Sequence, residues 1–169
     1  MAIEIRKGTK EDVEDFIAFL ARIRAQMDHP EWFYLDSPQE VRRLMESGVM
    51  QLWLAVDGSR IAGIYDYLVP GEAPYNYGYD LDFSREQLLR VINMDNAAVH
   101  PDYRGLGLQR RMMQVAEESL RDTGHWHLLC TIHPDNRYSL QNAQAMGYTI
   151  QKELPKYGST RYILRKDIF

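Results

Sequence analysis

Residues 97–110 have the sequence AAVHPDYRGLGLQR, and this stretch decides the fold class. The apolar run that leads into it favours a strand that ends at Val99, because a His-Pro pair interrupts the run. Gly105 and Gly107 then precede a helix, and glycine allows positive φ angles and leaves the backbone N–H groups unobstructed. The first N–H groups of a helix have no intrahelical acceptor, so this strand, turn and helix predict an anion site that suits a pyrophosphate.

Other phosphate-binding motifs fit this turn less well. No Gly-Lys-Ser/Thr triplet follows the glycines, so the turn is not a P-loop. A third glycine and an acidic residue about twenty positions further on are also missing, which argues against a dinucleotide fingerprint. Arg104, Arg110 and Arg111 add positive charge around the turn. Two glycines are also typical of an ordinary helix start, so the turn alone indicates no more than a candidate anion site.

The chain on both sides of the turn predicts alternating strands and helices. A strand over 91–99, a helix over 108–121 and a strand over 127–132 form a unit that supplies the parallel centre of a sheet. Periodicity, caps and turn signals predict strands over 3–6, 51–56, 60–68, 148–154 and 160–165, and helices over 10–27, 38–48, 84–87 and 138–146. We therefore expect an α/β fold with a mixed sheet of about seven strands and helices on both faces.

The composition favours one globular domain over 1–169. Of the 169 residues 45% are hydrophobic and 26% are charged, and a chain of this length can bury a full core. The formal net charge of −4 argues against nucleic-acid binding, because no basic stripe is available to neutralise phosphates. Cys130 is the single cysteine, which predicts a buried thiol in a reducing compartment. The sequence shows neither a secretion signal nor an apolar run of about 18 residues, so we expect a cytoplasmic protein that binds no membrane.

Two segments together resemble the coenzyme A signature of the GNAT superfamily of N-acetyltransferases. In the first, the family has a strand ending in Val-x-Pro followed by Arg/Gln-x-x-Gly-x-Gly/Ala. Arg104 and Gly107 match this pattern, whereas Gln109 stands where Gly or Ala is most common. The second segment, from Asn136 to Tyr148, is similar to the family's Asn-x-x-Ser/Ala helix that closes with Leu-Gly-Phe.

This resemblance, which is specific over residues 93–148, implies an N-acetyltransferase that uses acetyl-CoA and acts on a primary amine of a small molecule or peptide. It implies a GNAT-like, centrally splayed sheet, in which the pantetheine arm pairs with strand backbone exposed by the splay. Asn136 would contact that arm, although Asn is also typical of a helix cap. Homodimers are common in the family. The implied coenzyme A-binding residues are Ala97, Ala98, Val99, Arg104, Gly105, Leu106, Gly107, Leu108, Gln109, Arg110 and Asn136.

Acetyl transfer to an amine needs a base for the ammonium group, a donor for the oxyanion and a proton for the leaving thiolate. Family members often carry an acid or a histidine on the fourth strand. Steps of two and four residues back from Val99 stay on one strand face and select Ala97 and Asp95. Asp95 is therefore the candidate base, with Asn93 beside it, and a surface or hydrogen-bonded carboxylate is the alternative.

The tyrosine that many members use to protonate the thiolate is replaced by Ala143. Tyr138 lies on the same segment and is the candidate substitute, with a packed side chain and protonation by solvent as the alternatives. His133 follows the fifth strand and could lie near the site or be an ordinary loop residue. No His/Cys/carboxylate cluster predicts a metal site, and nothing near Cys130 in the sequence would activate its thiol.

The segment 72–80, EAPYNYGYD, is an unusually aromatic loop. Together with Tyr65, Tyr67 and residues 32–34 it could frame an acceptor pocket, or it could be a lid packed on the sheet. The acidic residues that would suit a cationic amine are Glu72, Asp80 and Asp82.

Two other functions remain open. A catalytically silent acyl-CoA-binding or sensing module would keep the glycine turn without a working base, and the alanine at position 143 is compatible with it. A nucleotide-binding regulatory domain fits the turn but not the segment that begins at Asn136.

Overall fold

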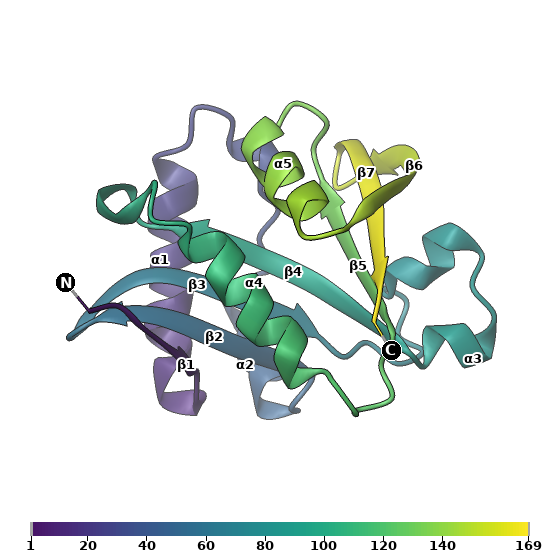
Figure 1. Cartoon of the computed structure of the whole chain (residues 1–169), viewed down its shortest axis with the longest axis horizontal. Coiled ribbons are helices and arrows are strands. Elements are labelled where there is room, and N and C mark those ends of the chain that lie inside the picture. Colours follow the sequence, from purple (N-terminus) through teal and green to yellow (C-terminus); the bar gives the residue numbers. More distant parts are fainter. Residues whose placement is uncertain (1, 169) are drawn as a thin grey trace. The chain divides into compact units, whose positions relative to one another are not determined.

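The computed structural model describes residues 2–168 and shows a seven-stranded sheet with the order β1-β2-β3-β4-β5-β7-β6 (Figure 1). The strands are β1 (Glu4–Lys7), β2 (Met50–Asp57), β3 (Arg60–Leu68), β4 (Val91–Val99), β5 (His127–Ile132), β6 (Thr149–Lys156) and β7 (Ser159–Asp167). The helices are α1 (Val13–Ala25), α2 (Pro38–Glu46), α3 (Arg85–Leu88), α4 (Leu108–Ser119) and α5 (Arg137–Ala145). Short 3₁₀ turns are η1 (Lys10–Asp12), η2 (Pro30–Trp32), η3 (Tyr77–Leu81) and η4 (Pro101–Tyr103).

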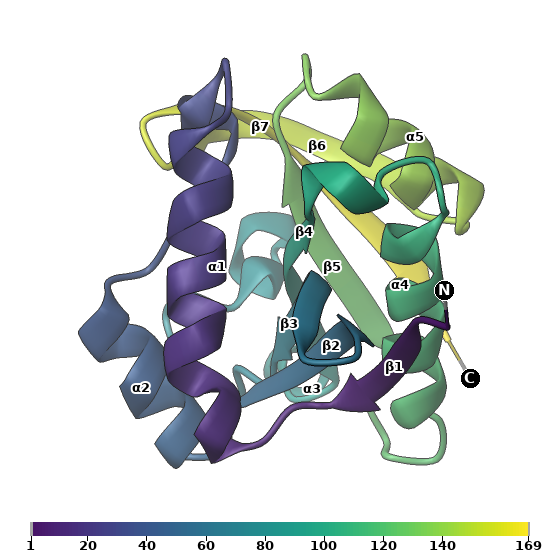
Figure 2. The ribbon, with the colours of Figure 1, turned by 90° about the vertical axis from the view of Figure 1, so that its left-hand side faces the viewer.

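The chain divides into two compact units, and β4 contributes to both. The first unit contains the residues up to Tyr67 together with Asn96–Ser119. In it, β1 pairs antiparallel with β2. α1 and α2 lie on one face of β1–β3, and α4 lies on the other face (Figure 2).

Gly63 on β3 allows α4 to approach the sheet of the first unit closely. A Cβ atom at this position would lie 2.9 Å from Cε of Met112 and 3.1 Å from the carbonyl oxygen of Ala98. Met112 is fully buried on the inner stripe of α4, which the periodicity of the sequence predicts. The glycine therefore allows both α4 and the end of β4, the strand that precedes the Gly105 turn, to lie close to β3.

The second unit contains Leu68–Asp95 and the residues from Leu120 onward. β5 pairs antiparallel with β7, and β7 pairs antiparallel with β6. The parallel ladder between β4 and β5 runs from Val91 opposite His127 to Asn93 opposite Leu129, whereas β4 continues to Val99. This short ladder agrees with the expected central splay.

Side-chain alternation defines two faces of the second unit. One of them, called the Asp95 face below, is covered by the segment between β3 and β4, because Tyr77 packs against Val91 and Leu129. The other face carries α5, since a Cβ atom at Gly147, just after α5, would lie 3.8 Å from the Lys166 side chain. Residues of the Asp95 face are Val91, Asn93 and Asp95 of β4, His127, Leu129 and Thr131 of β5, and Arg161, Ile163 and Arg165 of β7.

The α/β class, the mixed seven-stranded sheet and the helices on both sides are confirmed. The last two strands are longer than predicted, since β6 reaches Lys156 and β7 begins at Ser159. The prediction ended the first of them before Pro155, but β6 is an edge strand, where proline is tolerated. That one domain spans residues 1–169 stays a prediction.

Candidate functional site

Side chains of the first unit hold the turn at 100–107. Arg60 donates a 2.6 Å hydrogen bond to the carboxylate of Asp102, and the hydroxyl of Tyr103 donates to Oδ2 of Asp57 over 2.7 Å. The bond from Arg60 also lowers the pKa of Asp102. Because Asp57 ends β2 and Arg60 begins β3, this hairpin fixes the residues directly before the glycines.

The two glycines of the turn adopt the backbone conformation that the sequence predicts. Gly105 and Gly107 have φ angles of +81° and +69°. A Cβ atom at either position would meet no heavy atom of the described chain within 4 Å, so open space borders the backbone there. α4 begins directly afterwards, and the amide of Arg111 donates to the Gly107 carbonyl over 3.0 Å. Room beside the backbone, N–H groups at a helix start and the helix dipole fit a pyrophosphate.

The side chains around the glycines divide into buried and exposed ones. Leu108 and Gln109 are buried, at 1% and 8% exposure, whereas Leu106 is 49% exposed. Arg104 and Arg110 are exposed beside the turn. Gln109, the departure from the family pattern, therefore packs its side chain into the unit, and its backbone N–H remains part of the first helical turn.

The strand before the turn keeps strict alternation. Asp95, Ala97 and Val99 are half-buried, and the residues between them are buried. No bulge therefore intervenes between Asp95 and Val99. The side chains of Asp95, Ala97 and Val99 thus lie on the same face of β4, as the two-residue periodicity of a strand predicts. The amide of His100 donates to the carbonyl of Ala62 over 2.8 Å, which holds the end of β4 on β3.

Asn93 anchors the aromatic segment that precedes β4. Its Oδ1 accepts from the amide of Tyr77 over 3.2 Å, and its Nδ2 donates to the carbonyl of Tyr75 over 2.9 Å. Tyr77 is 3% exposed, and its ring packs on the Asp95 face. The aromatic segment is therefore packed on the sheet. The sequence had left open whether it frames an acceptor pocket or forms a packed lid, and this packing agrees with the lid.

The hydroxyl groups of Tyr77, Tyr157 and Thr131 lie together on the Asp95 face. The Tyr77 hydroxyl is 3.0 Å from the hydroxyl of Tyr157 and is also hydrogen-bonded to Thr131. Burial raises the pKa of Tyr77 well above its ordinary value, and the negative charge of Asp95 raises it further. Tyr77 thus stays protonated and able to donate, within the electrostatic reach of the candidate base.

Two of the acidic residues of the aromatic segment are engaged in ion pairs. Asp80 Oδ2 lies 2.8 Å from Lys156 Nζ, and Glu72 pairs with Arg85. Their charges are balanced within the unit, so they do not supply the negative wall expected for a cationic amine. Tyr65 and Tyr67, also considered for that wall, are core residues at 4% and 5% exposure.

The segment at α5 shows the features of a capped helix. The Oδ1 of Asn136 accepts from the amide of Ser139 over 3.3 Å, so Asn136 is an N-cap as well as a candidate pantetheine contact. Tyr138 is 57% exposed, and Ala143, at the position of the family's usual acid, is buried. The Nδ1 of His133 accepts from the amide of Asp135, which is ordinary loop geometry.

The sequence does not predict that Tyr157 lies beside Tyr77 and Arg161. Tyr157 has φ +56° and is followed by Gly158 at +74°, so the two form the tight turn between β6 and β7. A Tyr-Gly pair between two β-rich runs is a turn signal that could have placed this tyrosine at a hairpin tip. Arg161 carries no such signal, because only the strand pairing shows which face it joins.

Over residues 2–168 no three His, Cys, Asp or Glu side chains are grouped so as to hold a metal ion. No helix within the same range is long and apolar enough to cross a membrane.

Comparisons with known proteins agree on one family. Residues 19–148 match the family model described as Acetyltransferase (GNAT) family. The curated L-amino acid N-acyltransferase MnaT of Escherichia coli is 31% identical over 61 residues, a match that spans 36% of this chain and 36% of that protein.

Two solved structures share the fold over nearly all of both chains. A GNAT-family acetyltransferase from Streptococcus pneumoniae has a TM-score of 0.75 at 18% identity, with 99% of this chain and 100% of that chain covered. NAA60 of Arabidopsis thaliana, solved in complex with acetyl-CoA, has a TM-score of 0.78 at 13% identity, with 99% of each chain covered.

Proposed function

Because the chain belongs to the acetyltransferase (GNAT) family, an acetyl-CoA-dependent group of acyltransferases, we propose that it acetylates a primary amine of a small molecule or peptide. The observation that carries the proposal is the turn at Gly105 and Gly107. Both residues have positive φ angles and border open space at the start of α4. In the proposed complex, the N–H groups of this helix start bind the pyrophosphate, and Arg104 and Arg110 add charge beside it.

The other proposed coenzyme A contacts come from β4 and the cap of α5. The backbone of residues 97–99 pairs with the pantetheine arm, and Nδ2 of Asn136 contacts the same arm while its Oδ1 caps the helix. Acetyl-CoA when bound supplies an activated acyl group, so the protein has only to position it and to move protons.

Asp95 is the proposed base. It accepts a proton from the ammonium group of the acceptor, whose nitrogen then forms a bond to the acetyl carbon as the bond from that carbon to sulfur breaks. The acylated nitrogen releases its remaining extra proton to solvent, and the leaving thiolate takes a proton from Tyr138 or from solvent. General base catalysis by a positioned carboxylate contributes about 10²–10⁴ in rate, so Asp95 is the residue on which turnover depends most in this mechanism.

Ligand-dependent stability tests the coenzyme A part of this proposal. Acetyl-CoA at a hundred times its Kd should stabilise the protein by about 2.7 kcal/mol, whereas ATP should not. Release of the coenzyme A thiol in the presence of a panel of amines, amino acids and peptides then tests the transfer. If acetyl-CoA leaves the melting temperature unchanged, the proposed site is wrong.

A catalytically silent acyl-CoA-binding module is the second candidate. The buried Ala143 favours it, because the hydroxyl that many family members use at this position is missing. Stabilisation by acetyl-CoA without thiol release for any amine would favour this function. For either function the proposed setting is the cytoplasm, where a lone buried thiol such as Cys130 stays reduced.

A further inference from the structure

The tip of the β2–β3 hairpin is fastened to η4, the turn that leads into Gly105. The carboxylate of Asp57 accepts a 2.7 Å hydrogen bond from the Tyr103 hydroxyl, and Arg60 donates to Oδ2 of Asp102 over 2.6 Å. The two bonds span 46 and 42 positions of the sequence, so only the tertiary structure brings these partners together. The four residues Asp57, Arg60, Asp102 and Tyr103 are called the hairpin clamp below.

Further contacts order the residues of the hairpin clamp. Tyr103 is buried, with 4% exposure, and Cζ of Arg60 lies 5.2 Å from the centre of its ring. The carboxylate of Asp57 raises the pKa of Tyr103 by accepting its hydrogen bond, so the hydroxyl stays protonated and remains the donor. His100 stabilises η4 from within, since its Nδ1 accepts from the amide of Asp102 over 3.1 Å. Together these contacts fix η4 directly before the two glycines.

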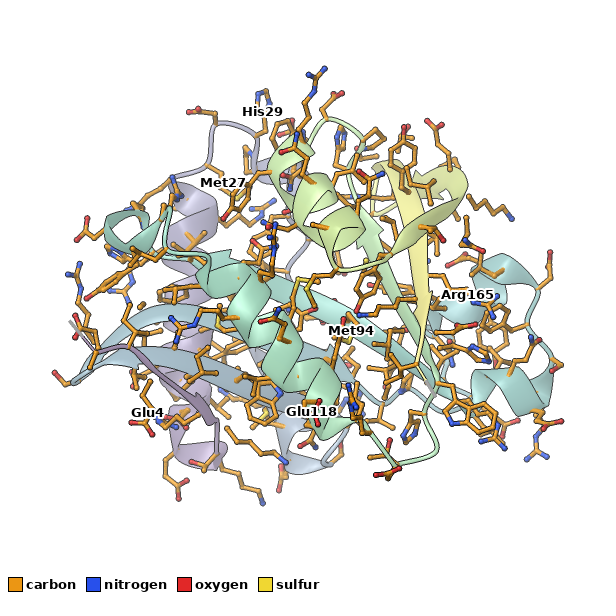
Figure 3. All side chains as sticks on the ribbon, viewed as in Figure 1. Glu4, Met27, His29, Met94, Glu118 and Arg165 are labelled. Carbon is orange, nitrogen blue, oxygen red and sulfur yellow. The ribbon has the colours of Figure 1, made fainter. Side chains whose placement is uncertain are left out.

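The glycine turn itself supplies little that would hold its conformation. Glycine has the largest backbone freedom of all residues, Gly105 and Gly107 border open space, and Leu106 between them is 49% exposed. The turn is therefore held from its two ends, by the buried Leu108 of α4 on one side and by η4 on the other. The hairpin clamp lies at this N-terminal end of α4, whose opposite end carries Glu118 (Figure 3).

We propose that Asp57 and Arg60 are positioning residues of the coenzyme A site. By holding η4 through Tyr103 and Asp102, the β2–β3 hairpin keeps the glycine turn in the conformation that binds the pyrophosphate. The inference rests on the proposed function and adds to it two residues that act on the ligand only through η4.

This role has a distinct kinetic consequence. When only a fraction of the molecules has the binding-competent turn, the affinity for acetyl-CoA falls by that fraction. Once acetyl-CoA occupies the site, its own contacts hold the turn, so the later steps no longer depend on the hairpin clamp. Loss of the clamp should therefore raise the Kd and the KM for acetyl-CoA and leave kcat unchanged.

Substitutions that remove one bond of the hairpin clamp test the proposal. Tyr103→Phe should raise the Kd for acetyl-CoA about tenfold, because the lost hydrogen bond ends on a charged carboxylate. Arg60→Gln removes an exposed ion pair and should raise the Kd about two- to fivefold. Calorimetry measures the Kd, and release of the coenzyme A thiol measures KM and kcat with the best acceptor of the unmodified protein. We expect KM to follow the Kd while kcat stays within about twofold.

Conservative variants and a matched control separate positioning from a general loss of stability. Asp57→Asn keeps an oxygen that accepts from the Tyr103 hydroxyl, and Arg60→Lys keeps a positive charge, so both should retain most of the affinity. Arg42→Gln is the control, because Arg42 pairs with Glu14 at 2.7 Å in the same unit and is as exposed as Arg60, at 52%. That ion pair joins α1 to α2, so its loss should leave the Kd unchanged. Melting temperatures establish that each variant is folded.

A purely structural role of the hairpin clamp predicts a different result. Tyr103→Phe would then melt at a lower temperature, yet the folded variant would bind acetyl-CoA as tightly as the unmodified protein, and this outcome would overturn the inference. A fall in kcat at unchanged KM, or an equal loss of affinity in Arg42→Gln, would refute it as well. If acetyl-CoA fails to stabilise the unmodified protein, the proposed function itself is contradicted.

Discussion

The hydroxyl of Tyr77 lies 3.0 Å from the hydroxyl of Tyr157, which is 80 positions further along the chain. This bond joins the segment before β4 to the tip of the β6–β7 hairpin. Lys156 and Lys152 reinforce the connection, since both donate to Asp80. The second unit thereby holds two loops in a fixed relation on the face that carries Asp95.

Removal of the Tyr77 and Tyr157 hydroxyls should lower the free energy of unfolding, and the effects of the two changes should not be additive. Tyr77→Phe loses hydrogen bonds to Thr131 and Tyr157 and should destabilise the fold by about 1–2 kcal/mol, whereas Tyr157→Phe loses one half-exposed bond and should cost about 0.5–1 kcal/mol. The double variant should cost less than the sum of the two, because both remove one shared bond. Urea unfolding of the four proteins measures the coupling, and strict additivity would show that the bond contributes nothing.

Asp95→Asn should abolish most turnover and keep the coenzyme A site. The amide has nearly the same shape but cannot accept the acceptor's proton, so kcat should fall by about 10²–10⁴-fold. Acetyl-CoA affinity, followed by calorimetry, should stay the same. Asp122→Asn is the matched control, since Asp122 is exposed and its left-handed φ of +61° suits asparagine. Unchanged turnover in folded Asp95→Asn would remove this residue from the mechanism.

Gly107→Ala should weaken acetyl-CoA binding more than it weakens the fold. The φ angle of +69° makes any side chain cost about 1–2 kcal/mol, and the added methyl group enters the space proposed for the pyrophosphate. Gly48→Ala is the control, because Gly48 has φ +79° and equally open surroundings just after α2. Both variants should melt at similar temperatures, and calorimetry should find lower acetyl-CoA affinity only for Gly107→Ala. Equal affinities would argue against pyrophosphate binding at this turn.

Acid should weaken the first unit through Asp12. Hydrogen bonds from Arg6 lower the pKa of Asp12 to about 2, below the 3.8 of an unperturbed carboxyl group. The folded state thus binds the proton more weakly than the unfolded state, so this stabilisation is complete above pH 4 and is lost as the pH falls toward 2.

Urea unfolding at pH 5 and pH 3 measures this effect. Asp12→Asn should reduce the loss of stability between the two pH values by roughly 1 kcal/mol, once solvent screening of the half-exposed Arg6 is allowed for. The same pH dependence in the variant and in the unmodified protein would show that another group is responsible.

The sequence predicted β4 and β5 residue for residue, because strong apolar runs end there at clear breaks such as His100-Pro101. It predicted helices over most of their lengths from caps and periodicity, for example Ser37 before α2. The sequence did not predict how far β6 extends toward the tip of the β6–β7 hairpin. Pro155 is unfavourable in a strand unless that strand lies at the edge of a sheet. Whether a strand lies at the edge depends on its pairing with strands distant in sequence, and local sequence patterns carry no information about that pairing.

The sequence by itself determined the order of the elements and the glycine turn before α4. Both follow from local chemistry: side-chain periodicity, capping, and the positive φ angles that Gly105 and Gly107 adopt without strain. The tertiary structure alone decided that Tyr77, Tyr157 and Arg161 gather on the Asp95 face. Strand pairing and packing bring these residues together, and a shift of register by one residue would send Arg161 to the opposite face.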